Sequence, residues 1–164
     1  MGEITAGELW ARRSTLENEA ATSLGHMLFE FSRLDVNLGL CLVWVDGGSN
    51  IDSLTKSVSN QNLKGKLDEV TKHVNAKLSP GSKGHSAYEM WIRRVHDVRQ
   101  VRNNLVHGRW GVEPSKNKVV NVVGLPTSDD QQSNDYTIEE LAAINEELRS
   151  LQLELSRLRK HWPL

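Results

Sequence analysis

The sequence predicts an all-α protein, an up-down helical bundle of four to five helices with a small β-hairpin inserted before the last helix. Along three long stretches, apolar residues recur three or four positions apart, which is the spacing of amphipathic helices. Alternating apolar residues between turn signals are confined to about residues 109–123, which indicates a hairpin. The 164 residues, 38 % of them hydrophobic, suffice for one core, so we expect a single domain over residues 1–164.

The first helix is expected over about residues 14–45, with a start as early as Ala6. Its second half, residues 36–45, is apolar nearly all round, which indicates a central helix or one that also faces a partner. Asp35 lies on the packed face of this helix. It is either a polar residue tolerated near the edge or the carboxylate partner of a buried arginine, Arg102.

A more polar helical region is expected over residues 51–78, with a break near residues 59–60. Its lysines form either a solvated face or a rim that contacts phosphates. They are Lys56, Lys64, Lys66, Lys72 and Lys77.

A third helical pattern runs from about Ser86 to Leu105, and its apolar residues fill an arc of roughly 180°. Arg102 falls inside this arc. Because a guanidinium keeps its proton and needs partners, we expect Arg102 to be mostly buried and paired with a carboxylate or with backbone carbonyls. Gly108 is expected to end the helix in the left-handed conformation.

After the hairpin, residues 127–135 are polar and are expected to form a mobile loop. Thr137 should cap the last helix, with Glu140 as its capping-box partner. A heptad seam of apolar residues, most of them leucines, runs from Leu141 to Trp162. This seam predicts a helix that packs antiparallel on the first helix, or one that forms a dimer.

Composition excludes several classes of function. The 20 basic and 21 acidic residues nearly cancel, so no global field attracts nucleic acid, although several arginines gather near residue 102. The single cysteine, Cys41, excludes an internal disulfide and fits a reducing cytoplasm. Neither a membrane span nor a leader is evident, so we expect a cytoplasmic protein without membrane association. The histidines form no ligand cluster, so no metal and no cofactor is expected.

The segment Arg102-Asn103-Asn104-Leu105-Val106-His107-Gly108, here called the Arg–His segment, resembles the HEPN superfamily (higher eukaryote and prokaryote nucleotide-binding domains). The family motif is Arg, four to six residues, then His, often with a polar residue directly after the Arg. Arg102, Asn103 and His107 match it with the four-residue gap, and the resemblance spans about residues 16–162. It implies a two-fold homodimer with a composite cleft. Many members of this superfamily are RNases of toxin–antitoxin or phage-defence systems, so the resemblance also implies such an activity. Other members have lost the activity, and their motif residues have only a structural role.

An imidazole transfers protons near neutral pH, and a guanidinium can hold a phosphate and offset its charge during cleavage. These groups suit metal-independent RNA cleavage. Five helical residues rotate by about 140°, however, so Arg102 and His107 do not share a face. Either His107 swings back beyond the helix end, or a dimer joins two pairs. The candidate catalytic residues are Arg102, His107 and Asn103, and the supporting residues are Asp35, His96, Arg99 and Arg109.

Two functions stay open at this point. The protein is either a metal-independent endoribonuclease that leaves 2′,3′-cyclic phosphate ends, or a catalytically inactive helical interaction module. In the second case Arg102 and His107 are structural and the partner is a protein, as for an antitoxin. A basic concave cleft around His107 favours RNA, whereas a flat apolar patch favours a protein partner.

Overall fold

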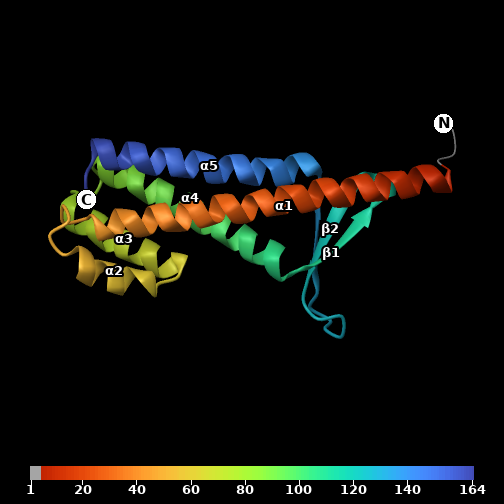
Figure 1. The fold of residues 1–164 in the computed structure, drawn as a ribbon, viewed down its shortest axis with the longest axis horizontal. Coiled ribbons are helices and arrows are strands. Elements are labelled where there is room, and N and C mark those ends of the chain that lie inside the picture. The colour runs from red at the N-terminus through yellow and green to blue at the C-terminus, as the bar shows by residue number, and fades with distance from the viewer. Residues whose placement is uncertain (1–4) are drawn as a thin grey trace. The chain divides into compact units, whose positions relative to one another are not determined.

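The computed structural model describes residues 5–164 and divides the chain into two compact units. The first unit comprises the residues up to Phe29 together with Arg99–Glu147, and the second comprises Glu30–Val98 and Leu148–Leu164. The helices are α1 (Ala6–Val43), α2 (Ile51–Ser59), α3 (Leu63–Lys77), α4 (Lys83–His107) and α5 (Ile138–His161), and a three-stranded sheet precedes α5 (Figure 1). The prediction of a mostly helical fold is confirmed.

Local sequence signals determine where several of the helices begin and end. The break predicted near residues 59–60 separates α2 from α3, and the Asn62 side chain accepts a hydrogen bond from the Gly65 amide at 2.9 Å. Before α5, the Thr137 hydroxyl accepts from the Glu140 amide at 3.1 Å, and the Thr137 amide donates back to the Glu140 carboxylate at 2.8 Å. The predicted capping box is therefore present.

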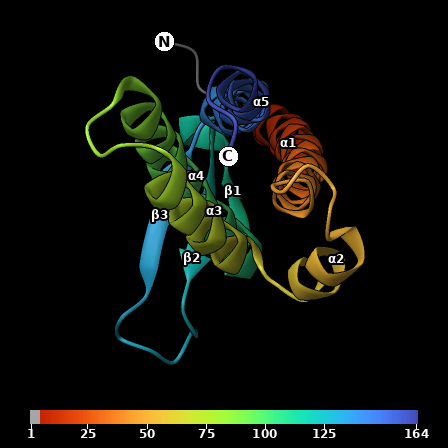
Figure 2. The same cartoon turned by 90° about the vertical axis from the view of Figure 1, so that its left-hand side faces the viewer.

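Helix α5 packs alongside α1 but runs parallel to it, so the expected antiparallel arrangement is wrong (Figures 1 and 2). In the second unit, Glu30 contacts Arg149 and, further along both helices, Asn37 contacts Gln152. The antiparallel neighbour of α5 is α4. There, the Tyr88 hydroxyl donates to the Trp162 carbonyl, whereas the later residue Trp91 donates to the earlier carbonyl of Leu151. A leucine seam can pack against a parallel or an antiparallel helix, so the seam of α5 does not determine the relative direction of its neighbour.

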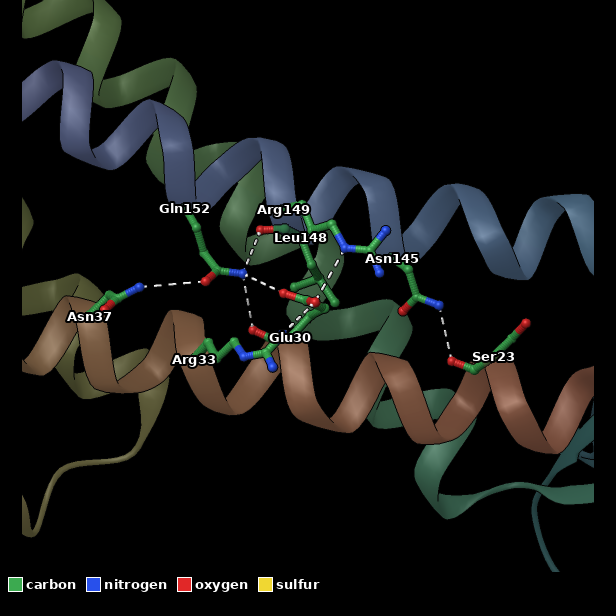
Figure 3. Close-up of polar contacts among 8 residues, drawn as sticks. All are labelled: Ser23, Glu30, Arg33, Asn37, Asn145, Leu148, Arg149 and Gln152. Atoms are coloured by element: carbon green, nitrogen blue, oxygen red, sulfur yellow. Dashed lines mark hydrogen bonds and ion pairs between the residues drawn. The ribbon is translucent and has the colours of Figure 1, made fainter.

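The carboxylate of Glu30 sits at the contact of α1 with α5 in the second unit, although Glu30 is only 6 % exposed (Figure 3). It accepts from Arg33 Nη1 at 2.7 Å, from Gln152 Nε2 at 2.9 Å and from Arg149 Nε at 3.2 Å. Burial raises the pKa of this carboxyl, but the hydrogen bonds from Gln152 and Arg149 and the two arginine charges outweigh burial and lower it. Glu30 is therefore held in its charged form by α5.

The sheet belongs to the first unit and has the antiparallel order β1 (Arg109–Glu113), β2 (Lys118–Val123), β3 (Gln132–Tyr136). The first two strands are the predicted hairpin. The expected mobile loop is wrong over residues 132–135, which pair with β2 as part of β3. Because β3 is an edge strand whose side chains are largely exposed, it needs no apolar alternation, and backbone hydrogen bonds to β2 suffice to form it.

Candidate functional site

The Arg–His segment comprises the C-terminal end of α4 in the first unit and the residue after it, Gly108. Arg102 is half-buried, and its Nη1 donates to Asn103 Oδ1 at 3.3 Å. His107 is exposed and is the last residue of α4, and the Gly108 amide still donates to the Asn104 carbonyl at 3.0 Å. The helix therefore does not end early enough for His107 to swing back beside Arg102.

Arg102 is half-buried rather than mostly buried as expected, and Asp35, its expected partner, has another partner in its own unit. Within the second unit, Asp35 Oδ2 binds Lys66 Nζ at 2.7 Å. Lys66 is 7 % exposed, and its amine lies 3.7 Å from where a Cβ on Gly39 would stand. The flexible aliphatic chain of Lys66 thus passes Gly39 and brings its ammonium group to Asp35. Lys66, one of the five lysines of the predicted polar region, therefore links α3 to α1.

Two of the other predicted supporting residues, His96 and Arg109, interact with residues outside the Arg–His segment. His96 belongs to the second unit, where its charge helps to lower the pKa of Asp68 on α3 after the larger effect of the Lys64 hydrogen bond. Arg99 is half-buried in the first unit. Arg109 is exposed and donates to Gln131, which in turn donates to the Ser128 carbonyl at 3.0 Å. Arg109 therefore ties β1 to the loop before β3.

Asn121 on β2 is fully buried against the end of α4, and it was not among the predicted site residues. With its amide nitrogen toward the Asn104 carbonyl, it donates there at 3.3 Å and accepts from Trp110 Nε1 at 3.3 Å. Trp110 Nε1 also donates to the Leu105 carbonyl at 2.9 Å. The sequence signal that could have identified Asn121 is a polar residue inside the run Val-Val-Asn-Val-Val. Alternation along the strand puts Asn121 on the same face as buried Val119.

Gly108 is glycine for a different reason from the one expected. Its φ is not positive, so no left-handed conformation ends α4. A Cβ built on Gly108 would stand 2.5 Å from Asn121 Cγ and closer still to the Asn121 amide atoms. The absence of a side chain at Gly108 is what lets β2 approach the end of α4.

We expect Gly108→Ala to lower the free energy of unfolding by about 1–3 kcal/mol, because the added methyl overpacks a site where buried Asn121 has no room to retreat. Urea unfolding measures this. Gly111→Ala is the matched control, since a Cβ at Gly111 meets nothing within 4 Å. Equal stability of the Gly108→Ala variant and the wild type would contradict the packing described here.

A groove of about 310 Å³ lies between α1 and the sheet in the first unit. Its lining is largely apolar and includes Val112, Val119 and Leu24 together with the aromatic residue Trp110. Arg13 and Glu17 on α1 are its charged lining residues. Because Trp110 also binds the Leu105 carbonyl, the groove wall is attached to the last turn of α4.

A second pocket, of about 340 Å³, lies in the second unit and is lined partly by Cys41, Trp44 and Arg159. Burial raises the pKa of the Cys41 thiol, which the charge of Arg159 only partly offsets. This thiol is therefore held in its neutral form, and a neutral thiol is a poor nucleophile.

Over residues 5–164, no three histidine, cysteine or carboxylate side chains are grouped so that they could hold a metal ion. None of the described helices is long and apolar enough to cross a membrane. Comparison with known proteins found no matching family model, no matching curated protein and no matching solved structure.

Proposed function

We propose that this protein is a metal-independent endoribonuclease of the HEPN type, acting in a toxin–antitoxin or phage-defence setting, with Arg102, Asn103 and His107 as its catalytic residues. One observation carries the proposal. The last turn of α4 presents an exposed imidazole that has no hydrogen-bond or ion-pair partner among the described residues, five positions after a guanidinium that contacts Asn103. An imidazole needed only as a structural cap would be expected to bind a carbonyl or carboxylate.

The chemistry assigns a role to each group. His107 takes the proton of a ribose 2′-hydroxyl, whose oxygen then forms a bond to the adjacent phosphorus. The guanidinium of Arg102 offsets the added negative charge on the phosphorane, and Asn103 orients that guanidinium. The bond from phosphorus to the 5′-oxygen breaks, and that oxygen takes a proton from a second imidazole or from water. The products are a 2′,3′-cyclic phosphate and a 5′-hydroxyl.

A two-fold homodimer fits this chemistry better than a single chain. Because α4 stays helical through His107, the Arg102 and His107 side chains leave it about 140° apart. In a two-fold homodimer, the same surface of both copies forms the interface, so His107 of one copy can face Arg102 of the other. The second imidazole that protonates the 5′-oxygen then comes from the partner.

Cleavage of RNA in the presence of a chelator tests the proposed function. Purified protein incubated with total RNA and EDTA should produce fragments that end in 2′,3′-cyclic phosphate, because imidazole and guanidinium supply every proton transfer and charge that the step needs. End-group analysis of the fragments is the measurement. Intact RNA, or cleavage that EDTA abolishes, would overturn the proposal.

We expect the dimer interface to include α4 or the apolar end of the first helix, where Val36, Leu40 and the following Trp44 are 55 %, 49 % and 51 % exposed. They stand four positions apart, so they share a stripe about 80° wide. Light scattering at high micromolar concentration should give twice the monomer mass, and Leu40→Glu should give the monomer mass. Exposed Leu153→Glu on α5 is the control. A monomeric wild type would remove the composite site.

The same stripe supports a second candidate function, an inactive interaction module that binds a protein partner such as an antitoxin. In that case the exposed apolar stripe binds a different protein, and the residues of the Arg–His segment have only a structural role at the end of α4. A wild type that is monomeric and leaves RNA intact would favour this second function.

A further inference from the structure

The groove between α1 and the sheet combines features that suit an unpaired nucleobase. Trp110 offers an aromatic ring, and Val112 and Leu24 offer aliphatic surface. Flat bases in single-stranded RNA bind proteins by stacking on aromatic rings and by hydrogen bonds along their edges. The volume, about 310 Å³, lies at the lower end of the range of pockets that hold small molecules, roughly 300–1,000 Å³.

The charged groups of the groove are available to a ligand. Glu17 has no hydrogen bond or ion pair with any residue in the described part of the chain. The Arg13 guanidinium carbon lies 5.6 Å from the centroid of the exposed Trp10 ring, a cation–π contact that leaves its N–H groups to other partners. Arg13 and Glu17 are four residues apart on α1, so they stand on one face of the helix, yet they are not paired with each other.

The groove is also close to the proposed cleavage site along the chain. Trp110 follows His107 by three residues, so their Cα atoms are within about 11 Å of each other. The indole N–H holds the Leu105 carbonyl at 2.9 Å, which fixes the wall of the groove to the turn that carries His107. A base in the groove would belong to a nucleotide beside the scissile phosphate.

We propose that this groove binds an unpaired guanine base of the RNA substrate, stacked on Trp110, with the Glu17 carboxylate accepting from the adjacent guanine N1–H and N2–H groups. This inference rests on the proposed function, since it assigns the base to RNA that His107 cleaves. Guanine is preferred because only this common base presents two neighbouring donors along one edge to a carboxylate. Adenine, cytosine and uracil each offer at most one donor beside an acceptor. Arg13 then lies beside the base, where it can hold the phosphate of the same nucleotide.

The direct test uses the indole N–H resonance of Trp110 in a ¹⁵N-labelled protein, assigned by its loss in Trp110→Phe. Titration with guanosine monophosphate should shift this resonance. The monophosphates of adenosine, cytidine and uridine should bind roughly 5- to 150-fold more weakly, the ratio that about 1–3 kcal/mol of bidentate recognition gives. Glu17→Gln should remove this preference, whereas Glu19→Gln, which changes an exposed carboxylate outside the groove, should keep it.

Blocking the groove is the second arm of the test. Ala21 lines the groove and is exposed, so Ala21→Phe should fill the groove and abolish the shift of the Trp110 resonance without disturbing the core. Ala11→Phe, at an exposed alanine of the same helix outside the groove, should bind like the wild type. A Trp110 resonance that does not move, that moves equally with all four nucleotides, or that moves equally in Ala21→Phe would overturn the proposal.

The titration needs no cleavage, so the two proposals can fail separately. His107→Ala should bind guanosine monophosphate like the wild type if the groove is the base site. Cleavage that depends on His107, with no guanine binding, would overturn the base site alone. Guanine binding in a protein that leaves RNA intact would overturn the nuclease and with it the assignment of the base to a cleaved substrate.

Discussion

Replacing His107 with alanine is expected to lower the rate of RNA cleavage by about 100- to 10,000-fold, the usual contribution of a general acid or base. The free energy of unfolding should change by less than about 1 kcal/mol. The reason is that His107 is exposed, and a cation in the last turn of a helix contributes only about 0.3–1 kcal/mol. Loss of activity at nearly constant stability distinguishes a catalytic imidazole from a structural one.

The measurement pairs the initial rate on a defined RNA with urea unfolding of the same sample. His26→Ala is the matched control, because His26 is also an exposed histidine on a helix of the first unit. Arg102→Ala should lose activity as well, and because Arg102 is half-buried and donates to Asn103, it should also lose about 0.5–1.5 kcal/mol of stability. If His107→Ala cleaves as fast as the wild type, the Arg–His segment is not the active site.

A clear loss of stability, about 1.5–3 kcal/mol at neutral pH, is expected from Glu30→Ala, because its nearly buried carboxylate accepts hydrogen bonds from charged groups. Removing the carboxylate deletes the hydrogen bonds that it accepts from Arg149 and Gln152 at the contact of α5 with α1, although Gln152 keeps its backbone acceptors (Figure 3). Urea unfolding at pH 7 measures the loss. Arg33→Ala is the control, because the Arg33 side chain is 61 % exposed and such an ion pair contributes only about 0–1 kcal/mol.

The same carboxylate predicts a dependence of stability on pH. The pKa of Glu30 is lower in the folded protein than its ordinary value, so the folded state binds this proton less tightly than the unfolded state. The contribution of Glu30 is then fully present above the ordinary glutamate pKa and is lost as the pH falls through the lowered, folded value. Unfolding of the wild type between pH 7 and pH 3 should show this loss, and the curve for Glu30→Ala should be flatter. Parallel curves would show that Glu30 is not held as a charge.

Local signals in the sequence determined the elements of this fold. Helical spacing of apolar residues placed α1 and α4, and the Thr137–Glu140 capping box placed the start of α5. These features depend on neighbours within about four positions, so the chain shows them without a fold. The Arg–His segment was found in the same way, because its spacing is a property of one helix end.

What only the tertiary structure decided involves partners that are distant along the chain. Asp35 binds Lys66, 31 residues away, because the flexible lysine side chain reaches it beside Gly39. Gly108 is required by the buried side chain of Asn121 and not by its own φ. Residues 132–135 form a strand because β2 offers unpaired backbone groups. The parallel course of α1 and α5 likewise depends on where α4 packs. An apolar seam or an unpaired backbone donor requires a partner, but neither specifies which segment of the chain that partner is.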